Sequence, residues 1–267
     1  MTLATDGMKM SEQENDFSHK RDFYDEFWGS RFRRRYTYAN QGKLRRFRRL
    51  LNRRSSELPT NARIFEQGFG MGMMLECFSK ASTITGVELS NSSVTAAEKA
   101  LRKKGFSNVD LRVAHAGTPY PAEWLQKADF AISSHVLEHL KQPDQGLLQL
   151  ITMVKTGGRV CIMVPINEEI GQDVHHFSYF TTESIHRLAR QLGLSVIEVH
   201  ECDYLWNVGV PIARRLQQGG GIKASLYSKV FNAAFGFLPA WVLCVTDAVL
   251  KKLGWRPCQC ILWCEKL

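Results

Sequence analysis

Hydrophobic and polar residues follow two regular patterns from residue 62 onward. Short apolar runs, typical of buried strands, alternate with stretches that repeat an apolar position every three to four residues, as helices do. The strand-like runs are 62–67, 83–89, 109–115, 128–136, 159–166, 195–204 and 258–267. The helix-like stretches are 73–81, 93–105, 144–158 and 181–194. This alternation predicts an α/β domain with a doubly wound, mostly parallel sheet and right-handed crossovers.

Local signals mark where several of these helices begin and end. Serine and threonine precede the 93–105 stretch and Gly105 closes it. We expect Thr182 to cap the start of the 181–194 helix, and Gly157 and Gly158 to end the 144–158 helix.

Two segments lie outside the alternation. Residues 17–58 predict a helical arm that follows a floppy polar tail at 1–16, and residues 205–256 predict a helical insert between the core at 59–204 and a last strand at 257–267. The insert is apolar from 226 to 255, but Asn232, Pro239 and Asp247 interrupt it. We therefore expect amphipathic helices kinked near Pro239, in preference to a membrane span.

Charge and cysteine content indicate which partners and which cellular compartment suit the protein. The 267-residue chain carries 35 Lys and Arg against 26 Asp and Glu, with basic stretches at 31–36 and 43–54. Such stretches suit nucleic acid, anionic lipid or phosphorylated substrates, or are the solvated side of a helix. No RNA-binding module is recognisable, which disfavours nucleic acid. Seven cysteines, and an N-terminus with no apolar leader, favour free thiols in the cytoplasm.

Three of the cysteines, Cys258, Cys260 and Cys264, share one side of the last predicted strand. They lack the C-x-x-C spacing of zinc sites, so we expect small core residues rather than metal ligands.

A glycine-rich loop, "EQGFGMG" at 66–72, follows the first predicted strand. A phosphate-binding P-loop needs Lys and Ser or Thr after its last glycine, whereas Met73 and Met74 follow Gly72 here. A dinucleotide site has G-x-G-x-x-G spacing, whereas these glycines are evenly spaced. The preceding acid, Glu66, suits a ligand with a cationic amine. The loop therefore favours neither of those two ligands.

The chain resembles the class I S-adenosylmethionine (SAM)-dependent methyltransferases. The resemblance rests on the acid and glycines at 66–72, "GVEL" ending in Glu88 and Leu89, "SHVLEHL" at 134–140, "MVKTGGRVCIMVP" at 153–165 and "HHFSYFTTESI" at 175–185. It covers residues 60–205 and the last strand. It implies a Rossmann-like, doubly wound, seven-stranded sheet with an antiparallel last strand.

The resemblance also implies the cofactor site. Glu66, Gly68, Gly70, Gly72, Glu88, Leu89 and Ser134 would hold SAM, with Glu88 accepting from the ribose hydroxyls. The family often has an acid after the third strand that contacts the adenine amine. This chain departs from that pattern, and His115 or the Ala116 backbone would have to replace it.

Histidines near the expected acceptor side leave three hypotheses open. His135, His139, His175 and His176 follow the fourth and fifth strands, so one of them would serve as a general base or orient the acceptor. Alternatively, the "LEH" turn is structural. In the third hypothesis His135, Glu138, His139 and His176 bind a divalent metal, because some family branches place one on a similar E-x-x-E-H with a later histidine. We do not commit to a metal.

The arm and the insert would then shape the acceptor pocket. Candidate lid residues are Tyr24, Trp28, Tyr36, Tyr38, Tyr204 and Trp206, with Phe231, Phe235, Phe237, Leu238 and Trp241 on the apolar face of the insert. That face would enclose a hydrophobic acceptor, rest on a membrane beside the basic arm, form a homodimer contact or extend the core.

We expect methylation of a small-molecule or lipid-like acceptor, most simply on oxygen. The alternatives are an RNA methyltransferase, an N- or C-methyltransferase and a non-catalytic SAM-binding protein.

Overall fold

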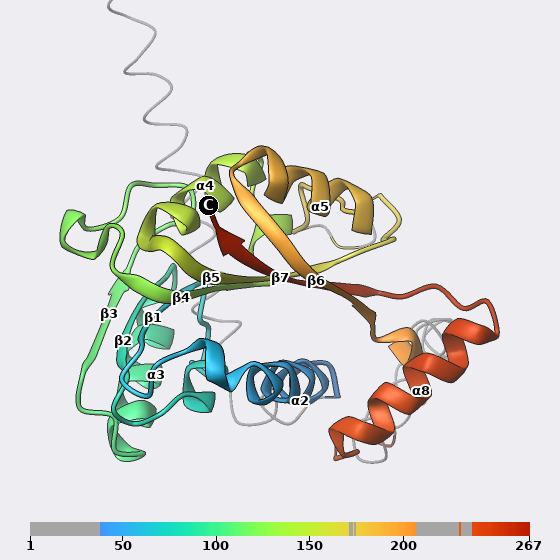
Figure 1. Ribbon diagram of the computed structural model, residues 1–267, viewed down its shortest axis with the longest axis horizontal. Helices are drawn as coiled ribbons and strands as arrows, with labels where there is room; N and C mark the ends of the chain where they lie inside the picture. Colours follow the sequence, from blue (N-terminus) through green and yellow to red (C-terminus); the bar gives the residue numbers. More distant parts are fainter. Residues whose placement is uncertain (1–37, 171–172, 174, 207–229, 231–236) are drawn as a thin grey trace, which may run out of the picture.

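The computed structural model describes residues 38–170, 173, 175–206, 230 and 237–267. Its centre is a seven-stranded sheet of order β3-β2-β1-β4-β5-β7-β6 (Figure 1). The strands are β1 (Arg63–Gln67), β2 (Thr83–Glu88), β3 (Val109–Val113), β4 (Ala128–Ser134), β5 (Val154–Pro165), β6 (Leu194–Cys202) and β7 (Gln259–Lys266). Only β7 runs antiparallel to its neighbours, and the other pairs are parallel. The predicted fold class is confirmed.

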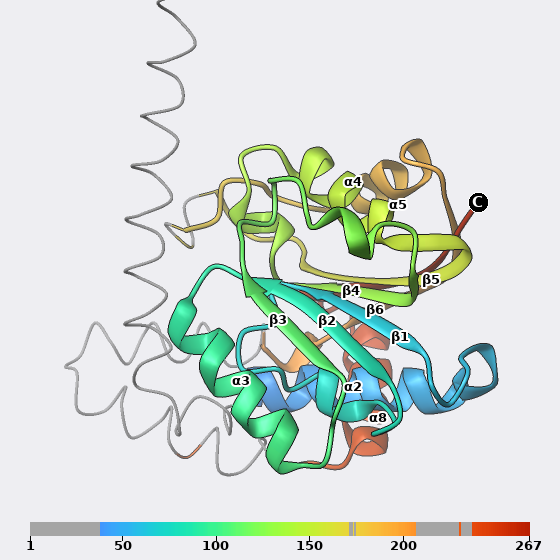
Figure 2. The ribbon, with the colours of Figure 1, turned by 90° about the vertical axis from the view of Figure 1, so that its left-hand side faces the viewer.

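Helices cover both faces of the sheet (Figures 1 and 2). One face carries α2 (Tyr38–Arg53), α3 (Asn91–Lys103) and α8 (Ala240–Lys252), and the other carries α4 (Pro143–Met153) and α5 (Thr182–Gln191). Each face buries its own hydrophobic cluster, because the central strands are apolar on both sides. Phe47 and Leu101 lie in one cluster, Leu147 and Ile185 in the other.

Two helix boundaries differ from their predictions. The N-cap of α5 is Thr181 rather than Thr182, and Thr181 forms a reciprocal capping box with Ser184. Helix α4 ends at Met153, so Gly157 and Gly158 belong to the irregular start of β5, where the register to β4 shifts. Because apolar residues continue from the end of α4 into the start of β5, the sequence pattern does not reveal the boundary between them.

The helix predicted over 73–81 is wrong. That segment holds a single 3₁₀ turn, Leu75–Cys77, before the chain enters β2. The glycine loop takes 68–72 of the connection between β1 and β2, and the residues after it close i→i+3 bonds, Cys77 N–H to Met74 O and Phe78 N–H to Leu75 O, which form a 3₁₀ turn and not an α-helix. The helix over 93–105 is confirmed, with Ser90 as its N-cap and Gly105 in a left-handed conformation after it.

The arm and the insert are described in part. Helix α2 lies in the arm segment and α8 begins after Pro239 in the insert segment, and the two helices pack on each other. The predictions for Tyr24, Trp28, Tyr36, Phe231 and Phe235, and for the tail, lie outside the described residues. None of the described helices combines the length and hydropathy that crossing a bilayer requires. Cys260 and Cys264 are buried in the core and Cys258 is partly buried, all as free thiols.

Candidate functional site

A cavity of about 610 Å³ opens at the carboxyl ends of β1, β2 and β4. Polar and charged side chains from distant segments reach it, including Lys43, Glu66, Glu88, Glu138 and five histidines. Its apolar lining comes from Leu44, Phe69, Met71, Met73, Met74, Val87, Leu89, Val136, Leu140 and Phe177. The carboxyl edge of an open parallel sheet is where such folds bind ligands.

The glycine loop and Glu88 form one hydrogen-bonded unit. Glu88 Oε2 accepts from the Gly70 N–H at 2.8 Å, while Oε1 accepts from Leu89 N–H at 2.8 Å and Ser90 N–H at 3.2 Å. Glu88 is only 7% exposed. Charge-assisted bonds of this kind fix the carboxylate at the cavity edge beside the loop.

The three glycines serve different purposes. All have positive φ, which favours glycine. Gly68 leaves room for Val136, whose Cγ2 would lie 2.3 Å from a Cβ at that position. Gly70 and Gly68 line the cavity. Gly72 instead faces α3, where Ala97 Cβ would lie 3.2 Å from an added Cβ. The structure therefore places Gly72 in the packing of α3 on the loop and not among the cavity-lining residues.

Glu66 is a buried acid at the floor of the cavity. It is 2% exposed, and its Oε2 has no hydrogen-bond partner among the described residues. Burial raises the pKa of Glu66 well above its usual range, and the negative charge of Glu88 raises it further. A buried carboxyl oxygen without a partner is costly unless a ligand completes it. Glu66 thus fits the cationic ligand that its position before the loop predicts.

His115 and Ala116, the candidates for the adenine contact, both line the cavity. The side chain of Gln67 supports this part of the cavity wall. Its Nε2 donates to the Ala116 carbonyl at 3.1 Å and to Tyr120 Oη at 2.7 Å, and its Oε1 accepts from Ser133. Because Gln67 is fully buried with its amide paired, it fixes the position of the Ala116 backbone.

Glu138 is completely buried beneath the histidines. His135 Nδ1 lies 3.2 Å from Glu138 Oε1, but neither carboxylate oxygen makes a well-aligned hydrogen bond within the described part of the chain. Burial acts to raise the pKa of Glu138, but His135 and His139 outweigh it and lower the pKa below its usual value. A buried negative charge therefore faces the cavity.

His135 has a left-handed backbone, with φ of 55°, at the point where β4 ends. Its Nε2 lies 2.7 Å from Gln259 Nε2, which donates to it. The backbone N–H of His135 donates to Met163 O at 2.8 Å. Non-glycine residues rarely adopt this conformation, and they cluster at functional sites.

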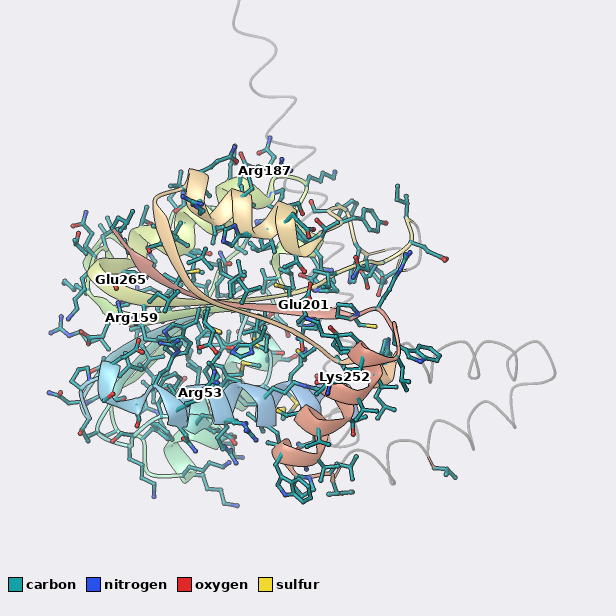
Figure 3. The ribbon with its side chains drawn as sticks, turned by 45° about the vertical axis from the view of Figure 1, so that its right-hand side comes forward. Arg53, Arg159, Arg187, Glu201, Lys252 and Glu265 are labelled. Atoms are coloured by element: carbon teal, nitrogen blue, oxygen red, sulfur yellow. The ribbon has the colours of Figure 1, made fainter. Side chains whose placement is uncertain are left out.

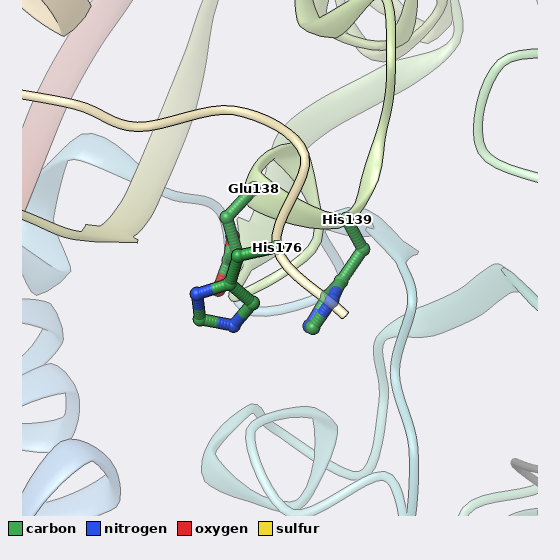
Figure 4. Close-up of side chains that lie close together, drawn as sticks. All are labelled: Glu138, His139 and His176. Atoms are coloured by element: carbon green, nitrogen blue, oxygen red, sulfur yellow. The ribbon is translucent and has the colours of Figure 1, made fainter. Parts of the chain in front are cut away.

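His139 and His176 lie close to Glu138 and to each other (Figure 4). Their ring centroids are 4.8 Å apart in an edge-to-face arrangement. His139 Nδ1 lies 3.0 Å from the His175 carbonyl oxygen, and burial lowers the pKa of His139. His176 Nδ1 contacts Glu168 Oε2 at 2.7 Å; burial acts to lower the His176 pKa, but Glu168 outweighs it and raises the pKa. The two histidines thus differ in their preferred protonation state.

Comparison with known proteins accords with this fold and cavity. A family model described as a methyltransferase domain matches residues 33–199, well over half of the chain. The chain belongs to this methyltransferase family. Its fold is that of the class I SAM-dependent enzymes, and SAM is its cofactor. A search of curated proteins found no match to the sequence of this chain.

Solved structures share its fold. The [4+2]-cyclase SpnF is 21% identical, with a TM-score of 0.55 over 82% of this chain and 80% of that one. A phosphoethanolamine N-methyltransferase of Haemonchus contortus is 15% identical, with a TM-score of 0.57 over 91% and 60%. Geranyl diphosphate C-methyltransferase of Streptomyces coelicolor A3(2) is 11% identical, with a TM-score of 0.55 over 82% and 78%. At these identities the likeness concerns the fold.

The metal hypothesis needs one correction. Glu138, His139 and His176 each offer a ligand atom within 4.8 Å of the others, and no further group of this kind occurs among the described residues. His135, which the hypothesis included, is not a member. Its ring is held between Glu138 and Gln259 and does not join the other three.

Five of the predicted lid residues are described and do not line the cavity: Tyr204, Trp206, Phe237, Leu238 and Trp241. His175 and Ser134, predicted for catalysis and for the cofactor, do line it. Tyr204 is buried near Asp247, and Trp241 faces outward. Within the described residues, the wall opposite the sheet comes from α2, through Asn40, Lys43 and Leu44.

Lys43 is a cavity residue that the sequence analysis missed. Burial lowers the pKa of Lys43, against the opposing charges of Glu138, Asp203 and Glu66. A signal was present: Lys43 is four residues before Phe47 and so shares the inward face of α2. A lysine on the buried face of an amphipathic helix is rare without a partner.

Proposed function

We propose that this methyltransferase transfers a methyl group to a hydroxyl of a small or lipid-like acceptor, with His139 as the general base. The observation that supports this most directly is the hydrogen-bonding state of His139 in the cavity. Its contact with the His175 carbonyl requires a proton on Nδ1, because a carbonyl oxygen only accepts. Nε2 then carries the lone pair that a base needs.

The cofactor would lie along the glycine loop. Glu88 would accept from the ribose hydroxyls, and Glu66 would face the cationic methionine part. His115 and Ala116 would border the adenine, with Leu89 and Ser134 beside it. SAM supplies an activated methyl group together with its own leaving group, so the protein mainly positions the acceptor and removes its proton.

The four candidate histidines are not equivalent. Burial lowers the pKa of His139, and also that of His135, which favours their neutral forms. His176 is held toward its cationic form by Glu168. His135 has both ring nitrogens engaged, with Glu138 and Gln259. His175 contributes its backbone carbonyl to His139. His139 is therefore the base, while the others position it and the acceptor.

A hydroxyl acceptor with an apolar body fits the cavity. Leu44, Met71, Met74, Val136 and Phe177 provide apolar walls, while the polar groups concentrate around Glu138 and the histidines. Lys43 would balance a negative charge that develops on the acceptor oxygen. The structural relatives named for geranyl diphosphate and phosphoethanolamine also act on small molecules.

A second candidate is metal-assisted methyl transfer at Glu138, His139 and His176. Two imidazoles and a carboxylate are ligand types that zinc and manganese accept. Apart from the 3.2 Å contact of Oε1 with His135 Nδ1, the carboxylate of Glu138 has no hydrogen-bond partner among the described residues, and a metal would supply one, which favours a fit. His139 Nε2 would serve as the ligand in this case, so the same nitrogen cannot also act as the base.

The test compares phenol, aniline and thiophenol bearing the same alkyl chain as acceptors of a radiolabelled methyl group from SAM. We expect methylation of the phenol, and His139→Gln should lower kcat about 10²–10⁴-fold with SAM affinity unchanged. His186→Gln, whose residue does not line the cavity, is the control. Methylation of the aniline alone would overturn the proposal.

Chelation separates the two candidates. General-base catalysis by His139 should survive dialysis against EDTA. Loss of activity on dialysis, restored by Zn²⁺ or Mn²⁺ in the wild type and not in His176→Ala, would instead establish the metal-assisted reaction.

A further inference from the structure

Helix α8 turns a charged residue inward and apolar residues outward. Asp247 is 7% exposed: its Oδ2 accepts from Arg46 Nε at 3.1 Å and Nη2 at 2.9 Å, and its Oδ1 accepts from Tyr204 N–H at 3.1 Å. Leu243, one turn earlier, is buried on the same side. These contacts fix the rotation of α8 about its axis, and with it the face that points to solvent.

The outward face is a continuous apolar stripe. Trp241, Val245 and Val249 follow one another at intervals of four residues and are 62%, 55% and 50% exposed. Leu253, just past the end of the helix, continues the row at 68%. We call these four residues the α8 stripe. Side chains at i and i+4 lie above one another on a helix, so the stripe is a real surface rather than scattered exposed residues.

The surroundings of the stripe are apolar or basic. Phe237 and Trp255, both exposed, extend it at its two ends. Lys251 and Lys252 are exposed in the last turn of the helix. Asp247 is the only acid between residues 237 and 257, and it is buried. Residues 237–257 therefore expose basic side chains and no acid of their own, although Lys251 pairs with Glu201 of β6 at 3.2 Å.

Position supports accessibility to a flat surface. Helix α8 lies beyond α2 at the margin of the molecule, on the side of the sheet opposite α4 and α5 (Figure 1). Lys252 on α8 and Arg53 on α2 lie on that same side, whereas Arg187 on α5 lies on the other (Figure 3). The thirteen residues of α8 span roughly 20 Å, which suits a helix lying in an interface rather than crossing a bilayer.

We propose that the α8 stripe binds the surface of an anionic lipid bilayer, with its apolar side chains in the interface and Lys252 among the headgroups. Tryptophans near both ends of an apolar helix face, flanked by lysine, are the composition that membrane interfaces select. The formal net charge of +9 adds long-range attraction to anionic lipid.

Two other occupants fit less well. A second copy of the chain carries the same positive charge, and one helix face is small against the roughly 800 Å² per partner of a stable interface. A nucleic acid would use the lysines but not the row of valines and leucine, since its outer surface is phosphate. This inference stands apart from the proposed chemistry, and either one can fail without the other.

The experiment is flotation of the full chain with vesicles of phosphatidylcholine alone or mixed with phosphatidylglycerol. We expect binding to the mixed vesicles, and Val245→Ser with Val249→Ser should reduce the partition coefficient about tenfold or more. Leu148→Ser, an exposed apolar position on α4 that is 44% exposed, is the matched control and should bind as the wild type does.

Charge and folding controls sharpen the test. Lys252→Glu should weaken binding about fivefold, and more than Lys127→Glu, which changes the net charge equally at an exposed site away from α8. The urea midpoint of the double serine variant should match that of the wild type, because the side chains are exposed. A lower midpoint would show that another part of the chain covers the stripe.

Three further results would each overturn the proposal. The first is no binding of the wild type to either kind of vesicle. The second is binding by the double serine variant equal to that of the wild type. The third is a wild-type dimer in light scattering that becomes a monomer in the double serine variant.

Discussion

A methyl group added at Gly68 would place a Cβ 2.3 Å from Cγ2 of Val136 and hold a side chain at φ of 66°. The left-handed backbone costs an alanine about 1–2 kcal/mol, and the overlap adds about 1–3 kcal/mol as Val136 is displaced. Gly68→Ala should therefore lower the free energy of unfolding by about 2–5 kcal/mol.

Gly157 separates the two contributions. It has φ of 75°, but an added Cβ would meet nothing within 4 Å. Gly157→Ala should therefore cost only the backbone contribution of about 1–2 kcal/mol. Combining Gly68→Ala with Val136→Ala should remove the overlap and recover about 1–3 kcal/mol relative to additivity.

Equilibrium urea unfolding of the wild type and of Gly68→Ala, Val136→Ala, their combination and Gly157→Ala measures these differences. Calorimetric titration with SAM reports whether each variant still binds the cofactor. If Gly68→Ala is no more destabilising than Gly157→Ala, or if Val136→Ala recovers nothing, the close approach of Val136 to the loop is not what requires this glycine.

Three shorter predictions concern the site and its supports. Glu88→Gln should weaken SAM binding about 10–100-fold in calorimetry, since a hydrogen bond to a charged group contributes about 1.5–3 kcal/mol; unchanged affinity would contradict the assigned cofactor role. Arg46→Met should cost about 3–5 kcal/mol in urea unfolding because it leaves Asp247 buried and unpaired, whereas Arg102→Met, which removes an exposed pair, should cost under about 1 kcal/mol. Protonated His139 cannot accept a proton, and burial lowers its pKa. The acid limb of kcat/KM should therefore lie below pH 6.5, the ordinary histidine value, and a limb well above it would exclude His139 as the base.

The sheet and the cofactor loop could be predicted because their signals are local. Strand-helix alternation, the glycine spacing and the acids at positions 66 and 88 each occupy a few consecutive residues. The helix over 73–81 failed on the same kind of evidence, since apolar residues there satisfy a helical pattern although the chain forms only one 3₁₀ turn. Propensity is a weak guide over so few residues, because tertiary packing overrides it.

The histidines show where sequence reasoning stops. From the sequence alone there was no reason to prefer one of the four candidate histidines over the others. The left-handed backbone at His135 turns its ring toward Gln259, from the far end of the chain. Only the loop after β5 determines that His139 meets a carbonyl and His176 meets Glu168.

By itself, the sequence determined the α/β order, the cofactor loop and the methyltransferase family, because each depends on residues that are close in the chain. The tertiary structure decided which glycine packs on α3, which lysine enters the cavity, which histidine meets an acid that raises its pKa, and which face of α8 meets solvent. These properties depend on burial and on charges contributed by segments far apart in sequence. A residue's desolvation and its partners exist only once the sheet has brought those segments together.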